Sequence, residues 1–463
     1  MSASEVYAPT ALPSEMNYAL PPSLPSAKST EIRIQPINAQ SFTRGNVIQI
    51  DLPTGRNTYL DPATTYCRFK ITYTSTGAIA TDSGYLLGSS YSPFIRQEVY
   101  GNNSVLLESI NEVGVLASML LNCQLNSSDK LGLSPAFGFN FTGAAVDTQV
   151  KGPESNIGHR IFVTNSSTAL DGLVFDYAFP LIGILGSGTD KMIPLGALNG
   201  LRLELTCDDV LNFTNTITAN KLSGYTISDF EFVGQVIELS PEANSLIAQA
   251  NPEKIYIRSQ TYRQSSAILP PQAGVGTYDL LCGIRVSSLK SLFVQCYTST
   301  LAELKYGSIF PNLTQGTCLL INGLSYPQRT LSPCEKPSDA FMELQKSFGA
   351  LSLSVFNGCI SKASYYRSST QSGLCQAFNS AGTKSEYANI INNPNQAYLG
   401  IDTEVVARKN NLLSGINCNA SPMFFRAQIG AILANTNHIL NFFGNYDVIL
   451  EIDVASKSII AKF

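Results

Sequence analysis

The chain has 463 residues, of which 44% are apolar and only 14% are charged, so it can fill more than one hydrophobic core but has few charges to solvate its surface. Its net charge is −4 and its Lys and Arg residues form no cluster, which argues against direct binding of nucleic-acid phosphates. No apolar run reaches the roughly 20 residues that a membrane-spanning helix needs, and the first residues do not have the pattern of a signal peptide.

The low charge has two interpretations. A surface rich in Ser, Thr and Asn can replace charged residues, and this chain has many of them. Alternatively, much of the surface is buried against other copies of the chain, because the cores of subunit interfaces are depleted in charge. We favour the second interpretation.

No cofactor or metal site is expected. The ten cysteines are scattered without a CxxC motif and there are only two histidines, so a zinc site of ordinary spacing is excluded. We expect reduced, buried thiols. His159 and His438 lie a whole domain apart, and each is expected to be a local hydrogen-bonding residue.

Residues 1–30 differ from the rest because proline recurs among small residues in APTALPSEMNYALPPSLPS. Proline removes a backbone donor and fixes φ, so we expect an extended arm rather than a helix or a sheet strand. The arm is either a disordered tail or a segment that orders on a neighbouring subunit. In the second case its apolar contacts with that subunit would come from Tyr7, Met16, Tyr18 and Leu20.

After the arm, apolar and polar residues alternate with the period of two that is typical of β-strands. The alternation is clear in YCRFKITYT from Tyr66, in LRLELT from Leu201 and in YDVILEIDV from Tyr446. One apolar face and one more polar face are typical of antiparallel sheets. Long loops rich in Gly, Ser, Asn and Thr separate these strands.

Two segments far apart in the chain end alike. ISDFEFVGQVIELS and FGNYDVILEIDVAS close at Ser240 and Ser456 with an apolar strand, an acidic residue and Ser. Other pairs recur at a spacing of roughly 220 residues, among them EIRIQP with KIYIRS, and LRLELT with FFRAQI. This ordered series predicts two copies of one unit.

Each copy contains a hairpin followed by a short amphipathic helix. The second hairpin carries the turn signal Asn322-Gly323 in LLINGL. This segment corresponds in position to YGNN in the first copy. The first helix is predicted to begin with the capping box Ser109-x-x-Glu112, and the second to run from near Ser338 to a C-cap at Gly349. The residues that these helices should bury are Val113, Leu116 and Leu120 in the first and Phe341, Leu344 and Phe348 in the second.

We therefore predict an all-β protein of two tandem eight-stranded antiparallel jelly rolls, with short helices in loops and an extended N-terminal arm. The predicted divisions are the arm at 1–30, the first jelly roll at 31–240, a linker at 241–253 and the second jelly roll at 254–463. An immunoglobulin-like sandwich is the alternative, although such units are nearer 100 residues. A single large barrel fits less well because the helix recurs once in each half.

No catalytic constellation stands out. The metalloprotease, nucleophile-elbow and P-loop motifs are absent, and AGTKS at Ala381 is expected to be a solvated loop. Asp208 and Asp209 could hold a hard cation together with loop carbonyls, although adjacent acids in a turn are usually solvated. Gly234 interrupts DFEFVGQVIEL and predicts a β-bulge.

The segment FIRQEVYGNNSVLLESI and the helix after it resemble the strand, hairpin and helix of double jelly-roll major capsid proteins of tailless double-stranded DNA viruses. The matching segment LLINGLSYPQRTLSPCEKPSDAFMELQKSFG, the strand SSLKSLF and the closing YDVILEIDV strengthen the resemblance. It covers about residues 31–463 and is nearest to the capsid proteins of polinton-like viruses, adintoviruses and virophages.

The resemblance implies a structural protein of the virion, assembled inside the host cell and without enzymatic activity. Three subunits would form a homotrimeric, pseudo-hexagonal capsomer, and neighbouring capsomers would tile an icosahedral shell. The other implied partners are a penton protein and minor capsid proteins. The arm would tie capsomers together or contact minor capsid proteins or an internal membrane.

Two other functions stay open. A two-jelly-roll amidase or glycosidase would use acidic residues at the domain junction, as peptide-N-glycanases do. A carbohydrate-binding protein would expose aromatic platforms, and this chain has 21 Tyr but no Trp. A trimer or particles would indicate a shell protein, whereas a monomer with glycosidase activity or glycan binding would indicate one of the alternatives.

Overall fold

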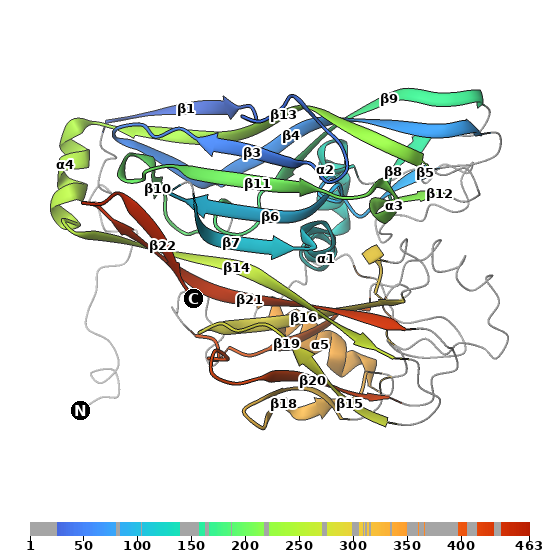
Figure 1. Cartoon of the computed structure of the whole chain (residues 1–463). Coiled ribbons are helices and arrows are strands. Elements are labelled where there is room, and N and C mark those ends of the chain that lie inside the picture. Colours follow the sequence, from blue (N-terminus) through green and yellow to red (C-terminus); the bar gives the residue numbers. More distant parts are fainter. Residues whose placement is uncertain are drawn as a thin grey trace, which may run out of the picture.

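The computed structural model consists of two β-sandwich lobes that lie side by side, with the arm segment before Ser26 outside the described part of the chain (Figure 1). The described residues are 26–79, 84–102, 104–138, 157–162, 166–186, 188–216, 222–270, 276–298, 305–308, 310, 313, 316–333, 336–349, 360, 365, 397–404, 414–429 and 437–463.

The first lobe contains two antiparallel sheets. One has the strand order β1-β13-β4-β9, and the short β2 and β10 pair with β13 and β4. The other has the order β3-β11-β6-β7, and a small sheet β12-β5-β8 lies at one end of the lobe (Figure 1). The bounds are β1 Ala27–Ile34, β2 Ser41–Phe42, β3 Val47–Leu52, β4 Thr58–Ile79, β5 Gly84–Leu87, β6 Phe94–Gly101, β7 Val105–Asn111, β8 Ile157–Phe162, β9 Ser166–Pro180, β10 Ile193–Pro194, β11 Leu201–Cys207, β12 Thr214–Thr216 and β13 Leu222–Leu239.

The second lobe also has two antiparallel sheets. Their orders are β14-β21-β16-β19, with β22 paired to β21, and β15-β20-β17-β18. The bounds are β14 Lys254–Leu269, β15 Gly276–Cys282, β16 Leu289–Thr298, β17 Thr317–Ile321, β18 Leu324–Leu331, β19 Leu399–Asp402, β20 Met423–Ile429, β21 His438–Asp453 and β22 Ser458–Lys462.

The two lobes share one strand order. If the short strands β2, β5, β8, β10 and β12 and the terminal β22 are set aside, each lobe has eight strands. The first, eighth, third and sixth form one sheet, and the second, seventh, fourth and fifth form the other, in both lobes. This is the jelly-roll arrangement. The predicted fold of two tandem eight-stranded jelly rolls is therefore confirmed.

The segment between the lobes contains a helix. Helix α4 (Pro241–Ala250) begins with Ser240 as its N-cap, whose hydroxyl accepts the backbone N–H of Ala243. β1 begins at Ala27, so the first strand starts inside the segment assigned to the arm. The divisions at 31–240, 241–253 and 254–463 remain a prediction.

Alternating burial follows the alternating sequence. In β11 and in its counterpart β20, every second residue is buried and the residues between them are partly exposed. In the core of the first lobe, the ring of Phe69 stacks on Phe230 at 6.0 Å between centroids and meets Phe94 edge-on at 5.4 Å. Each jelly roll therefore has its own packed interior.

The capping box predicted for helix α1 (Val113–Gln124) is wrong. Ser109 lies in β7, where its hydroxyl donates to Glu98 on the neighbouring strand β6. Glu112 occupies the N-cap position with a positive φ of 52° and makes no side-chain cap. Strand pairing has overridden the local helix signal, but Val113, Leu116 and Leu120 are buried as predicted.

Helix α5 (Pro337–Ser347) confirms the second helix. It begins one residue before Ser338, and Gly349 follows it with φ 69° and donates its N–H to the carbonyl of Lys346 at 2.8 Å. Leu344 is fully buried, whereas Phe341 and Phe348 are partly buried. The other helices among the described residues are α2 (Ser127–Phe137), the one-turn α3 (Val210–Phe213) and a 3-10 turn at Leu195–Ala197. None of the described helices is long and apolar enough to cross a membrane.

Two predicted local features are present. Asn322 and Gly323 both have positive φ, of 53° and 76°, and form the tight turn between β17 and β18. The pairing of β13 with β4 shifts register between Val233 and Gln235, so Gly234 marks the predicted bulge.

The described cysteines are free and buried, as the sequence predicts. Burial raises the pKa of Cys207 and of Cys282 to about 12, so these thiols stay protonated at neutral pH. Cys334, Cys359 and Cys375 lie outside the described residues.

Replacing Phe69 by Ala should lower the free energy of unfolding by about 3–5 kcal/mol, because it opens a cavity among aromatic rings that cannot close over it. Urea unfolding followed by tyrosine fluorescence measures the change. The control is Val174→Ala at a side chain that is 56% exposed, which should change stability by less than about 0.5 kcal/mol. An equal, small effect of both substitutions would contradict the packing described here.

Candidate functional site: the junction of the two jelly rolls

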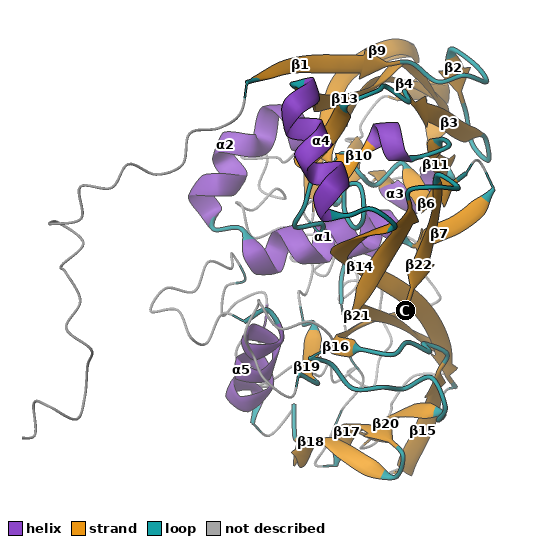
Figure 2. Ribbon diagram, turned by 90° about the vertical axis from the view of Figure 1, so that its left-hand side faces the viewer, coloured by secondary structure: helices purple, strands orange, loops and turns teal. Residues whose placement is uncertain are grey.

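The two jelly rolls meet along β7 and α1 of the first and β14 and β22 of the second (Figures 1 and 2). The segment after β9 runs along the edge of β14, where the N–H of Gln260 donates to the carbonyl of Gly188 at 2.8 Å. Thr189 pairs with Ser259 as an antiparallel bridge, and their hydroxyls are 2.8 Å apart. The first jelly roll thus covers the open edge of the second with backbone hydrogen bonds, which removes an exposed sheet edge.

A buried carboxylate of β7 joins the two lobes. Glu108 accepts hydrogen bonds from Gln97 at 2.9 Å, from the backbone N–H of Ile184 at 2.8 Å and from the hydroxyl of Thr261 in β14. Burial raises the pKa of Glu108, and the three hydrogen bonds act in the opposite direction by stabilising the charged form. Thr261 of the second lobe therefore completes a polar network built by the first.

A lysine of the second lobe reaches into the first. The Nζ of Lys305 lies 2.7 Å from Glu112 and 3.4 Å from Asp208, and its side chain is 8% exposed. Burial acts to lower the pKa of Lys305, but the two carboxylates outweigh it and raise that pKa. Burial also raises the pKa of Glu112, against the effect of Lys305. One ammonium group thus pairs with two carboxylates at the junction.

The next residue, Tyr306, fits between two glycines of the first lobe. Its hydroxyl donates to the carbonyl of Ser92 at 3.1 Å. A Cβ on Gly114 would lie 3.0 Å from that hydroxyl, and one on Gly88 would lie 2.7 Å from the ring. Only glycine leaves room for the tyrosine, so the shapes of the two lobes are matched at this point.

The last strand also packs on the first lobe. Ile459 of β22 covers Gly101 of β6, where any side chain would collide with it. The N–H of Asn199 donates to the carbonyl of Lys457 at 3.0 Å. The hairpin formed by β21 and β22 is therefore part of the junction as well as part of its own sheet.

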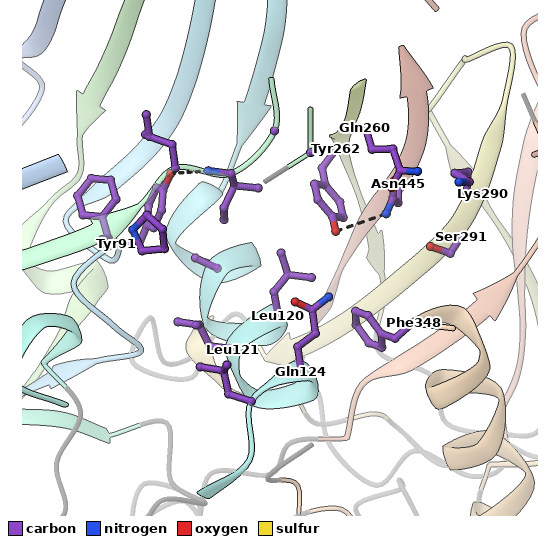
Figure 3. A pocket seen from close by; sticks show the side chains of 18 of the residues that line it. Tyr91, Leu120, Leu121, Gln124, Gln260, Tyr262, Lys290, Ser291, Phe348 and Asn445 are labelled. Atoms are coloured by element: carbon purple, nitrogen blue, oxygen red, sulfur yellow. Dashed lines mark hydrogen bonds between the residues drawn. The ribbon is translucent and has the colours of Figure 1, made fainter. Parts of the chain in front are cut away.

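Beside the end of α1 the junction is hollow. A cavity of about 660 Å³ separates α1 from the sheet of β14 and β16. Leu120 and Gln124 lie on its helical side, and Tyr262 and Ser291 lie on its sheet side (Figure 3). Lys290 at its margin makes ion pairs with Glu404 at 2.9 Å and with Asp447 at 3.6 Å.

The residues singled out in the sequence are not brought together. Asp208 pairs with Lys305, whereas Asp209 caps α3 through the N–H of Leu211 and pairs with Arg44. Their carboxylates therefore have protein partners, and no group of metal ligands occurs among the residues that the structure describes. His159 lies in β8 of the first lobe and His438 is buried in β21 of the second.

Other predicted features fall outside the described residues. These are the four arm contacts Tyr7, Met16, Tyr18 and Leu20, and the AGTKS loop from Ala381. The junction residues Glu108, Lys305 and Tyr306 could not be predicted from local patterns, because their partners in the other lobe lie far away along the chain. The one available signal was a charged residue between apolar ones, as Lys305 is in LAELKYGSIF.

No family model matches the chain, and no curated protein sequence matches it. Solved structures do. The structure of PBCV-1 VP54 fitted into a cryo-EM reconstruction of the virophage Sputnik covers 96% of this chain and 99% of its own, with 9% identity and a TM-score of 0.60. The Faustovirus major capsid protein has 10% identity and a TM-score of 0.59 over 94% of this chain and 92% of its own. The mavirus major capsid protein has 12% identity and a TM-score of 0.54 over 98% and 95%.

These similarities run through both jelly rolls, since nearly the whole of each chain is covered. The fold implied by the resemblance in the sequence is confirmed: the chain is a double jelly-roll protein, and it shares this fold with major capsid proteins of viruses and virophages.

Replacing Lys305 by Met should destabilise the junction by about 3–5 kcal/mol at neutral pH, because the buried Asp208 and the partly buried Glu112 then lose their shared cation. Protonation of Glu112, whose pKa is raised, relieves this cost. The loss should therefore be full above that pKa and shrink as the pH falls through it. Urea unfolding across a pH series measures the effect.

The matched control is Lys70→Met, which removes an exposed ion pair of the same 2.7 Å length, between Lys70 and Asp229. We expect little change in stability, because solvent screens such a pair. A pH-independent loss in the Lys305 variant, or an equal loss in the control, would contradict the role assigned to Lys305.

Proposed function

We propose that this chain is the major capsid protein of a double-stranded DNA virus, and that it acts by self-assembly rather than by catalysis. Three copies would form a pseudo-hexagonal capsomer, and capsomers would tile an icosahedral virion shell inside the host cell. The observation that carries the proposal is the repeated strand order in two lobes held together by a buried junction. A trimer of such a subunit presents six similar lobes.

The surface of the subunit supports the proposal. Charged residues are 14% of the chain, and large apolar side chains are exposed on the second lobe at Tyr256 (59%), Ile268 (63%), Leu281 (55%) and Leu324 (62%). Subunits of a shell would bury such side chains against one another. The major capsid proteins named above share the fold over nearly the whole chain.

The arm gives the subunit a second kind of contact. We infer that residues 1–30 extend to neighbouring capsomers, to minor capsid proteins or to an internal membrane. Penton and minor capsid proteins would complete the shell. The prolines and the spaced apolar residues of the arm suit a segment that orders only on its partner.

The purified chain should form a trimer of about 150 kDa, three times its mass of 49.9 kDa, or larger particles. Light scattering coupled to size-exclusion chromatography measures the mass at neutral pH. A stable monomer at micromolar concentration would contradict the proposal. A monomer that cleaves a glycan amide or glycosidic bond would indicate the enzyme, and one that binds glycans would indicate the carbohydrate-binding protein.

Replacing the apolar residues of the arm by Ser should leave the trimer intact but prevent shells from forming, because contacts between capsomers lose their anchors. The four positions are Tyr7, Met16, Tyr18 and Leu20. Light scattering reports the trimer and negative-stain microscopy reports the shells. The control replaces four serines of the same arm, Ser2, Ser4, Ser14 and Ser23, by Ala. Shells that form equally well in both variants would contradict this role.

A further inference from the structure

The cavity beside α1 lies between the two jelly rolls and has walls of two kinds. On the side of the first lobe, Ala117, Leu120 and Leu121 of α1 form an apolar stripe on one face of the helix. On the side of the second lobe, Phe348 adds an aromatic ring, and β14 and β16 add polar side chains (Figure 3). The volume of about 660 Å³ falls within the roughly 300–1,000 Å³ of small-molecule sites, which often lie at domain interfaces.

A buried hydroxyl on the sheet side of this cavity lacks a partner. Ser291 of β16 is 2% exposed, and its backbone lies between the neighbouring strands β19 and β21. Its hydroxyl makes no hydrogen bond with any residue that the structure describes, and in Figure 3 it points into the cavity. A hydroxyl that is removed from water without a new partner costs free energy. A molecule in the cavity would supply that partner.

Two further uncharged polar groups face the same space. The hydroxyl of Tyr262 accepts a hydrogen bond from the Nδ2 of Asn445 at 3.4 Å. Burial raises the pKa of Tyr262, so its hydroxyl keeps a proton that it can donate. Gln124 extends its carboxamide from α1 toward the sheet (Figure 3). The hydroxyl of Ser291, the phenol and the carboxamide can each donate and accept hydrogen bonds.

The cations of the cavity wall already have carboxylate partners. Lys290 pairs with Glu404 and Asp447, and Arg258 lies 3.7 Å from Asp447. The remaining charged residue of the wall, Asp190, is an exposed carboxylate that would repel an anion. A charged head group would have to compete with these ion pairs or lose its hydration without a partner of its own. The cavity therefore favours an uncharged ligand.

We propose that this cavity binds one uncharged amphiphile, with an alkyl chain along α1 and a hydroxylated head group among Gln124, Tyr262 and Ser291. A hydroxyl suits this end because it can accept from one of these groups and donate to another. The alkyl chain would cover the apolar stripe of α1 and the ring of Phe348. Such a ligand contacts both jelly rolls and would stabilise their junction. The site lies within one chain and does not depend on the proposed function.

The test measures binding of 1-decanoylglycerol to the purified chain by isothermal titration calorimetry, with decanoate and glycerol for comparison. We expect one molecule of 1-decanoylglycerol per chain, with a Kd on the order of 10–100 µM. Decanoate should bind at least about tenfold more weakly because its carboxylate finds no free cation, and glycerol should not bind because it lacks the alkyl chain. Equal binding of decanoate, or uptake of many molecules per chain, would overturn the proposal.

Substitutions locate the ligand. Gln124→Trp fills the cavity from an exposed position of α1 and should abolish binding. The matched control is Gln249→Trp at an exposed position of α4, which is not part of the cavity wall, and it should leave binding unchanged. Ser291→Ala removes one hydroxyl that has no protein partner, so the variant should fold and bind 1-decanoylglycerol about fivefold more weakly.

The outcomes are distinct. Binding that persists in Gln124→Trp, or that Ser291→Ala does not weaken, overturns the assigned site. A trimer that binds no 1-decanoylglycerol overturns the site and leaves the proposed capsid function intact. A monomer that binds one molecule in the expected way supports the site and contradicts the proposed function.

Discussion

The structure depends on the fixed orientation of one jelly roll against the other. Apolar packing alone would let one jelly roll slide against the other. The junction also contains hydrogen bonds and ion pairs, which require one particular geometry. Lys305 reaches Glu112 and Asp208, Thr261 donates to Glu108, and the chain at Gly188 accepts a backbone hydrogen bond from β14. Desolvating these groups costs free energy unless each finds its partner, so only one relative placement of the lobes satisfies them all. We interpret the buried charges as determinants of geometry rather than of net stability.

A fixed junction matters because the two lobes share one strand order. Three copies of such a chain would present six lobes of one strand order, as the proposed capsomer requires. The low charge of the sequence suits the proposed assembly, because the cores of subunit interfaces are depleted in charged residues. The repeated strand order and the fixed junction are the two features that suit the proposed building block of a shell.

Local patterns predicted the fold well and the junction hardly at all. Alternation in LRLELT, the Asn322-Gly323 turn and the bulge at Gly234 depend on neighbours along the chain, and the structure contains all of them. The capping box predicted at Ser109 does not form, because Ser109 lies in β7 and its hydroxyl donates to Glu98 of the neighbouring strand β6. Lys305 and Tyr306 contact residues that lie roughly 100 to 200 positions away, and no periodicity in a single sequence encodes such partners.

The most direct test of the account is a cryo-EM reconstruction of the assembled full-length protein. We expect a block of three chains with six β-sandwich lobes around a central axis, in which the two lobes of every chain keep the one orientation that the junction fixes. A reconstruction in which the lobes of one chain take variable orientations, or a preparation that contains only single chains, would contradict this expectation.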